Sequence, residues 1–147
     1  MQGKSTQGGV CFMERVRVLF VDDEPGIRIT MPQILRRHGL SVRAVATVNH
    51  ALAEITSAQF DVLISDLNIG QPGDGFTVVN AMRSTQPNCV TLILTGIPDV
   101  ETALEAIRNQ VDGYLTKPAQ IPMLMSLIEE KLQQRNSGKS AATKRLA

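Results

Sequence analysis

The chain has 147 residues, 43% of them hydrophobic and 20% charged, a composition typical of one folded domain with a sizeable core. Fifteen basic and fourteen acidic residues leave a formal net charge of +1, so no basic excess indicates direct contact with nucleic acid. No apolar run is long enough for a membrane span and no signal-peptide core is recognisable, so we expect a cytoplasmic protein without membrane contact.

The two ends of the chain differ in composition from its middle. Residues 1–13 are rich in Gln, Gly, Ser and Thr and lack periodicity, so we expect a disordered N-terminal extension. Residues 136–147 are polar and basic and are typical of a tail or linker. Gly-Lys-Ser triplets at 3–5 and 138–140 imitate the end of a phosphate-binding loop, but neither follows a predicted strand. The folded domain is therefore predicted over residues 14–135.

Five short apolar runs alternate with segments of helical periodicity in this domain. Apolar runs of this length with turn residues behind them predict buried strands. They occupy residues 15–21, 40–46, 62–68, 89–94 and 113–116. Five strand-helix units in succession predict an α/β fold with a parallel sheet, right-handed crossovers and helices on both faces.

The helical segments carry recognisable ends and faces. Pro25 suits the first turn of the first helix and Gly39 its end, whereas Pro32 inside that helix cannot donate a backbone hydrogen bond and predicts a kink. Thr47 or Asn49 is expected to cap the second helix. The third helix is expected to end before Pro87. Helical spacing predicts apolar faces for the fourth and fifth helices, formed by Val100, Ala103, Leu104 and Ile107 and by Ile121, Leu124, Ile128 and Leu132.

Polar side chains stand where four of the five predicted strands end. Asp22 and Asp23 follow the first strand, Asp66 ends the third, Thr95 follows the fourth, and Lys117 follows the fifth. In open parallel sheets, ligands bind outside the carboxyl ends of the strands. Each residue alone could be an ordinary turn or helix-terminus residue, but their occurrence at successive strand ends predicts convergence on one crevice.

These residue types suit phosphoryl transfer assisted by a metal ion. A hard divalent cation takes oxygen ligands, so Asp22, Asp23 and Asp66 predict a Mg²⁺ site that relieves their mutual repulsion. A carboxylate can also accept a phosphoryl group, and Asp66 is the expected acceptor. Lys117 would pair with the phosphoryl oxygens and the Thr95 hydroxyl would donate a hydrogen bond, because this chemistry depends mainly on positioning and charge neutralisation.

Four segments of the chain resemble the receiver domain of bacterial two-component response regulators. They are residues 21–25 (VDDEP), 65–68 (SDLN), 94–96 (LTG) and 114–118 (YLTKP), and the likeness covers about residues 14–133. It implies a flavodoxin-like fold with strand order 2-1-3-4-5. It also implies a regulatory, non-enzymatic domain, a monomer or weak homodimer, which takes a phosphoryl group from a sensor histidine kinase or phosphotransfer protein and acts on a downstream output domain or protein.

The resemblance also implies roles for single residues. The metal would be bound by the three carboxylates together with the backbone carbonyl of Asn68. Tyr114 would be an aromatic switch that turns inward when Thr95 moves toward the phosphoryl group. The peptide bond before Pro118 is expected to be cis. Phosphorylation would then shift the face formed by the fourth helix, fifth strand and fifth helix between two states.

The loop after Asp66 departs from the family pattern. The family commonly has proline four residues after the acceptor and Asp-Gly at seven and eight. Here Gly70 takes the first place, and Asp74-Gly75 come one residue later. This loop is therefore longer and richer in glycine than is usual.

Two other classes of function fit parts of the pattern. A phosphate-independent interaction module would keep the fold, but such modules typically lack one of the acidic pair, Thr95 or Lys117, all of which are present here. A small phosphatase with an aspartate nucleophile would want a general acid two residues beyond Asp66, where Asn68 stands. The phosphorylation switch accounts for more of the residues than either alternative.

Overall fold

Strands and helices alternate without exception through the part of the chain that the structure describes. The structure is a computed structural model that describes residues 16–146, with side chains placed for residues 16–137. The predicted disordered extension and the Gly-Lys-Ser triplet at 3–5 lie outside the described residues. In chain order the elements are β1 (Arg17–Val21), α2 (Pro25–Arg37), β2 (Ser41–Val45), α3 (Val48–Ser57), β3 (Val62–Asp66), α4 (Asp74–Thr85), β4 (Val90–Thr95), α5 (Val100–Arg108), β5 (Gly113–Thr116) and α6 (Ile121–Leu146).

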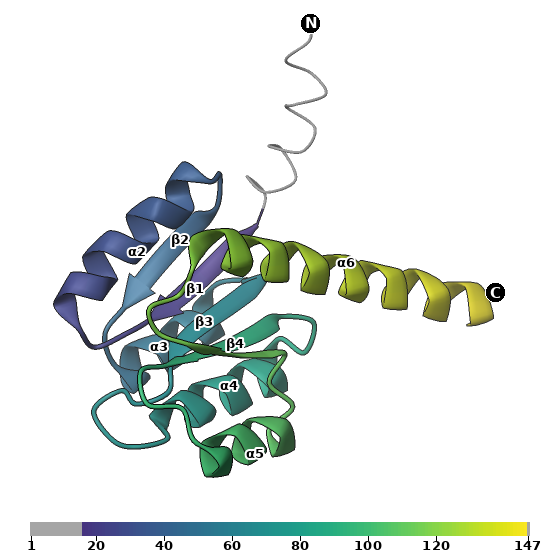
Figure 1. The fold of residues 1–147 in the computed structure, drawn as a ribbon. Coiled ribbons are helices and arrows are strands. Elements are labelled where there is room, and N and C mark those ends of the chain that lie inside the picture. Colours follow the sequence, from purple (N-terminus) through teal and green to yellow (C-terminus); the bar gives the residue numbers. More distant parts are fainter. Residues whose placement is uncertain (1–15, 147) are drawn as a thin grey trace, which may run out of the picture.

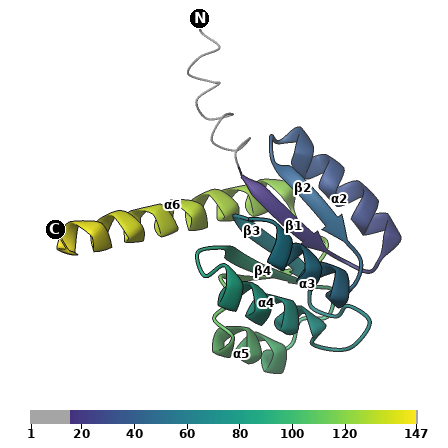
Figure 2. The same cartoon turned by 180° about the vertical axis from the view of Figure 1, so that it is seen from behind.

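The five strands form one parallel sheet in the order β2-β1-β3-β4-β5, which confirms the predicted fold class. Helices α2 and α6 lie on one face of the sheet and α3, α4 and α5 on the other (Figures 1 and 2). Each face packs its own apolar cluster, and alternate residues of β3 enter opposite clusters, Leu63 on the α3 and α4 side and Ile64 on the α2 and α6 side.

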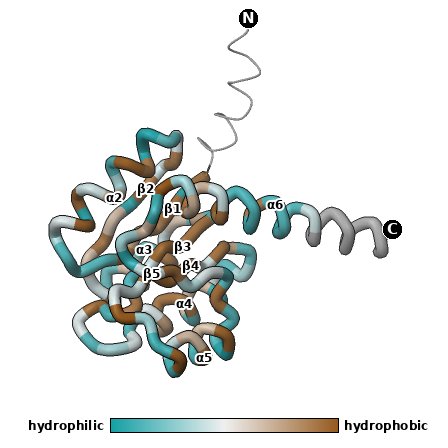
Figure 3. The backbone as a smooth tube through the Cα atoms, in the orientation of Figure 1, coloured by the Kyte–Doolittle hydropathy of each residue, from teal (hydrophilic) through white to brown (hydrophobic). Residues whose placement is uncertain are grey.

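Burial on both faces explains why the sequences of the central strands are uninterrupted apolar runs. Residues 62–65 of β3 and all of β4 are buried, as is β1 after Arg17, and their apolar positions lie in the interior (Figure 3). The edge strand β2 alternates instead between exposed and covered positions. This contrast is what a parallel sheet covered by helices on both faces requires.

Local chemistry sets several helix ends as predicted. The Thr47 hydroxyl accepts a hydrogen bond from the His50 backbone N–H at 3.1 Å and caps α3. Gly39 follows α2 with φ of +95°, a left-handed conformation that glycine adopts without steric cost. Pro32 lies inside α2, which continues to Arg37, and a kink at Pro32 stays a prediction.

The predicted apolar face of α5 lies on the outside of the molecule and does not pack into the core. Val100 is 76% exposed, Leu104 46% and Ile107 71%, whereas Ala106 is the buried residue of α5. Periodicity identifies a face but not what covers it, and here the small side chain of Ala106 makes the contact with the core.

Helix α6 packs its predicted apolar face on the sheet and continues beyond it. Leu124 and Ile128 are fully buried, and Ile121 and Leu132 pack against the same cluster, as predicted. The helix then continues to Leu146, through the segment predicted as a tail, and extends past the sheet (Figures 1 and 2). The Gly-Lys-Ser triplet at 138–140 therefore lies within a helix and not in a loop.

Across residues 16–146, no helix combines the length and the apolar composition needed to cross a bilayer.

Candidate functional site

Strand register brings the predicted residues to one edge of the sheet. Val21 of β1 pairs with Ser65 of β3, and Asp66 pairs with Leu94 of β4. Thr95 pairs in turn with Thr116 of β5. Because the strands are parallel, the residues just beyond these pairs share the carboxyl edge of the sheet.

Three carboxylates meet at this edge. Asp22, Asp23 and Asp66 each present an oxygen, and the three oxygens lie within 4.8 Å of one another. Asp22 is 1% exposed, Asp66 is partly buried and Asp23 is exposed. A cluster of oxygen donors open on one side suits a hard divalent cation that keeps some of its water or phosphate ligands.

Lys117 spans two of these carboxylates. Its Nζ lies 2.9 Å from Asp22 Oδ2 and 3.3 Å from Asp66 Oδ1, and its side chain is 19% exposed. Burial alone would lower the pKa of Lys117, but the hydrogen bond to Asp22 and the charges of Asp22 and Asp66 outweigh it and raise that pKa. The ammonium therefore stays charged beside the carboxylates.

The pKa of the Asp66 carboxyl depends on opposing effects. Burial raises the pKa of the Asp66 carboxyl most, the nearby Asp22 charge raises it further, and Lys117 lowers it, with a net rise above the ordinary value. A further positive charge at this edge, such as a metal ion, would relieve the repulsion between Asp22 and Asp66.

Backbone groups of the surrounding loops hold the carboxylates in place. The Glu24 N–H donates to Asp22 Oδ1 at 2.9 Å, and the Gly70 N–H donates to Asp23 Oδ2 at 3.1 Å. The side-chain oxygen of Asn68 accepts from the Gly73 N–H at 2.9 Å. The unusual loop after Asp66 is thus tied both to an acid of the triad and to its own second half.

Gly75 is a structural residue of the site that motif reasoning missed. It is the second residue of α4 and lies beside the end of β3, and its N–H donates to the Leu67 carbonyl at 2.8 Å. A Cβ at this position would lie 2.4 Å from the Asp66 carbonyl oxygen, closer than any real side chain approaches. The Asp-Gly pair in the loop was visible in the sequence, but the close approach depends on the packing of α4 against β3.

Thr95 and Tyr114 occupy neighbouring strands near this edge. Thr95 is buried, and its Oγ1 accepts from the Ile97 N–H at 3.1 Å. The Tyr114 hydroxyl lies 2.6 Å from Thr102 Oγ1 on α5, a partner that the sequence did not indicate. The Lys117–Pro118 peptide bond is cis, as the resemblance implies.

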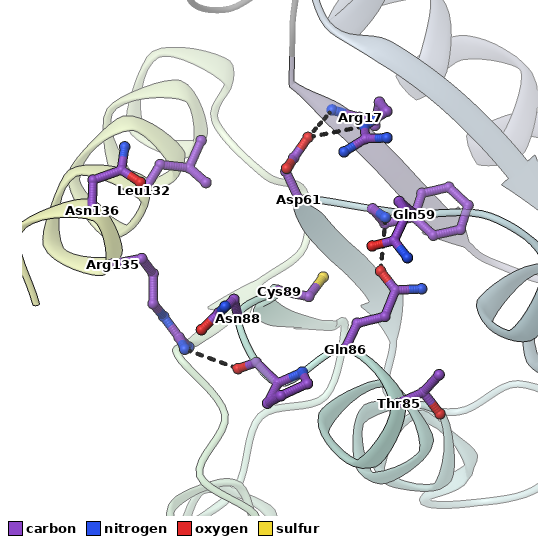
Figure 4. A pocket seen from close by; sticks show the side chains of 12 residues that line it. Arg17, Gln59, Asp61, Thr85, Gln86, Asn88, Cys89, Leu132, Arg135 and Asn136 are labelled. Atoms are coloured by element: carbon purple, nitrogen blue, oxygen red, sulfur yellow. Dashed lines mark hydrogen bonds and ion pairs between the residues drawn. The ribbon is translucent and has the colours of Figure 1, made fainter. Parts of the chain in front are cut away.

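A second hollow, of about 350 Å³, lies at the opposite, amino-terminal edge of the sheet (Figure 4). Its two arginines are engaged: Arg17 contacts Asp61 at 3.3 Å, and Arg135 of α6 donates to the Pro87 carbonyl at 3.2 Å (Figure 4). Burial raises the pKa of the Cys89 thiol at this edge to about 12. These contacts join residues of different elements. None of the residues predicted for the functional site lines this hollow.

Comparison with known sequences places the chain in a family. The response regulator receiver domain family matches residues 18–129. The DNA-binding transcriptional regulator NtrC of Proteus hauseri is 30% identical over 120 residues, which cover 82% of this chain and 25% of that regulator. The chain therefore spans about a quarter of the length of this curated relative.

Solved structures share the fold. A CheY-like response regulator receiver domain protein from Methanospirillum hungatei JF-1 is 25% identical, with a TM-score of 0.78 over 84% of this chain and 98% of that one. A response regulator from Burkholderia pseudomallei, solved with a phosphorylated aspartic acid, a calcium ion and citrate, is 24% identical, with a TM-score of 0.73 over 86% of this chain and 74% of that one. The chain belongs to the response regulator receiver domain family and is a receiver domain of two-component signal transduction.

Proposed function

We propose that Asp66 is the phosphoacceptor of this receiver domain. One carboxylate oxygen of Asp66 attacks the phosphorus of a phosphohistidine that carries a proton on its other ring nitrogen. The phosphorus–nitrogen bond breaks, its electron pair stays on the nitrogen, and neutral imidazole leaves. The observation that carries the proposal is the position of the Lys117 ammonium, 2.9 Å from Asp22 and 3.3 Å from Asp66, where it can neutralise charge on an incoming phosphoryl group. Hydrolysis by water at phosphorus would break the new phosphorus–oxygen bond and restore Asp66.

We propose Mg²⁺ as the cation of the acidic triad. Asp22, Asp23 and Asp66 would hold it, with the backbone carbonyl of Asn68, and oxygen donors of this kind are what the ion prefers. When bound, it supplies positive charge for the oxygens of the transferred group. The pKa of Asp66, raised by burial and by Asp22, supports the need for that charge.

The output of the switch is proposed to pass through Thr95 and Tyr114 to the surface formed by α5, β5 and α6. This surface carries the exposed stripe of Val100, Leu104 and Ile107 on α5. Met123, in the first turn of α6, is 58% exposed. Exposed apolar side chains grouped on one helix are typical of an interaction surface. An output domain or protein, or a second copy in a weak homodimer, would bind here.

The partners follow from the chemistry of the donor and from the relatives. A sensor histidine kinase or a phosphotransfer protein would supply the phosphoryl group. The relative NtrC is a DNA-binding transcriptional regulator about four times as long as the matched segment, so nucleic-acid contact in a longer protein would belong to another domain. The free, buried thiol of Cys89 is compatible with a cytoplasmic location.

Labelling with a small phosphoryl donor tests the acceptor. Acetyl phosphate with Mg²⁺ should label the wild-type chain, and Asp66→Asn should abolish this hydroxylamine-sensitive label because an amide cannot form the acyl phosphate. Asp61→Asn, which changes an aspartate paired with Arg17 at the opposite edge, is the matched control and should keep the label. Undiminished labelling of Asp66→Asn would refute the assignment, and labelling that survives chelation of Mg²⁺ would refute the metal.

A further inference from the structure

Tyr114 is hydrogen-bonded to the first turns of α5 through a residue with no part in the assignments above. The Tyr114 hydroxyl lies 2.6 Å from Thr102 Oγ1. Thr102 in turn contacts Asp99, the N-cap of α5, whose Oδ1 accepts from the Thr102 N–H at 2.7 Å and lies 3.0 Å from Thr102 Oγ1. Three side chains from two elements thus form one continuous set of hydrogen bonds.

The number of available protons indicates which group donates in each of these hydrogen bonds. An ionised carboxylate only accepts, and the hydrogen bonds from Thr102 lower the pKa of Asp99, which keeps it ionised at neutral pH. The hydroxyl of Thr102 has two acceptors on Asp99, the carboxylate Oδ1 at 3.0 Å and the backbone carbonyl at 3.3 Å, which favours donation of its single proton to Asp99. With that proton on Asp99, the Thr102 oxygen accepts from the Tyr114 hydroxyl, and the bonds run from Tyr114 to Thr102 to Asp99.

The same short segment also begins at the phosphorylation site. Thr95 Oγ1 accepts from the Ile97 N–H in the loop between β4 and α5, and this loop leads directly to Asp99 and Thr102. One end of the segment carries a hydroxyl proposed to contact the phosphoryl group, and the other holds the hydroxyl of Tyr114. The segment also leads into the helix with the exposed apolar stripe.

We propose that Thr102 is a positioning residue that holds Tyr114 in its α5-bound orientation and so sets the resting population of the switch. The proposal rests on the switch role proposed above for Tyr114. When the ring leaves this orientation, Thr102 keeps its bond to Asp99, whereas Tyr114 loses its acceptor. A hydrogen bond between neutral groups makes a net contribution that corresponds to about fivefold in an equilibrium, so Thr102 should favour the α5-bound orientation by about that factor.

The composition of the chain allows a direct measurement. It has one tyrosine and no tryptophan, so tyrosine fluorescence and the ring signals of selectively labelled tyrosine report on Tyr114 alone. Thr102→Val removes the hydroxyl with little change in shape and keeps the backbone bond to Asp99, and Thr102→Ala is a second hydroxyl-free variant. Thr102→Ser restores the hydroxyl. Thr56→Val is the matched control, because the Thr56 hydroxyl bonds only the Ala53 carbonyl within its own helix.

In the unphosphorylated full chain, Thr102→Val and Thr102→Ala should move the Tyr114 signal toward that of the protein saturated with beryllofluoride and Mg²⁺. Beryllofluoride, a mimic of the phosphoryl group, should bind these variants about fivefold more tightly in a calorimetric titration. Thr102→Ser and Thr56→Val should match the wild type. Since Tyr114→Phe removes the donor, adding Thr102→Val to Tyr114→Phe should not change the affinity for beryllofluoride further.

Two results would overturn the proposal. The first is an unchanged Tyr114 signal in both hydroxyl-free variants. The second is an effect of Thr102→Val on beryllofluoride affinity that adds fully to the effect of Tyr114→Phe. The resting Tyr114 signal is measured without any phosphoryl donor, so it is independent of whether Asp66 is the acceptor. Failure of the labelling experiment and failure of the Thr102 experiment are therefore separate outcomes.

Discussion

Replacement of Gly75 by alanine should destabilise the domain, although the same change usually stabilises a helix. Gly75 lies in α4, and its added Cβ would meet the Asp66 carbonyl oxygen at 2.4 Å and the Leu67 Cα at 2.9 Å. Ordinary contact begins at 3.4 Å, so the start of α4 must retreat from β3 by about 1 Å. Both neighbours are backbone atoms, one in the last residue of β3 and the other in the residue that follows it, so they cannot rotate aside as a side chain could.

The magnitude follows from three contributions. Overpacking of this kind costs about 1–3 kcal/mol, and weakening of the Gly75 to Leu67 hydrogen bond costs about 1 kcal/mol more. The better helix propensity of alanine returns about 1 kcal/mol. We therefore expect Gly75→Ala to lower the free energy of unfolding by about 1–3 kcal/mol, a large part of the stability of a typical domain.

Urea denaturation followed by circular dichroism measures this change, with Gly26→Ala as the matched control. Gly26 lies in the first turn of α2, and a Cβ there would meet nothing within 4 Å. Gly26→Ala should raise the free energy of unfolding by about 0.5–1 kcal/mol, because only the backbone entropy and helix propensity change. If the two variants shift the free energy in the same direction, the argument from close approach at Gly75 is wrong.

Three further predictions concern buried polar and titratable groups. Gln86→Leu should lower the free energy of unfolding by about 3 kcal/mol or more in urea denaturation, because the Gln86 side chain bonds three backbone groups, two of them buried and one partly buried. A free energy of unfolding within about 1 kcal/mol of the wild type would contradict this. Cys89 should resist alkylation at pH 8 in the folded protein and react only on unfolding, since burial raises its pKa to about 12. A Cys11→Ser background leaves Cys89 as the single thiol. Prompt labelling without denaturant would disprove the burial argument. The pKa of Asp66 is raised in the folded state, so the ionised carboxylate destabilises the fold above that pKa, and this destabilisation disappears as the pH falls below the ordinary carboxyl pKa. Without metal, Asp66→Asn should therefore be more stable than the wild type at pH 7 but not in acid. A lower thermal midpoint for the variant at pH 7 would refute this. Added Mg²⁺ should stabilise the wild type more than this variant.

Short-range patterns in the sequence were enough to predict the architecture and the members of the acidic triad. Period and length of the apolar runs identify buried strands, and the alternation with helices leaves a parallel sheet as the solution. Once the sheet is parallel, Asp22, Asp66 and Lys117 must share an edge, because each follows a strand at its carboxyl end. These conclusions need only the order of elements along the chain.

The distances between elements were decided by the tertiary structure alone. The bridge from Lys117 to two carboxylates, the contact of Gly75 with β3 and the bond from Tyr114 to Thr102 join residues whose separation in sequence predicts nothing about their contact. The exposure of the apolar face of α5 was undecided for the same reason, because periodicity shows that apolar residues share a side of a helix but not whether protein or solvent lies there. Local pattern determines which elements form, and only packing between them determines which side chains meet.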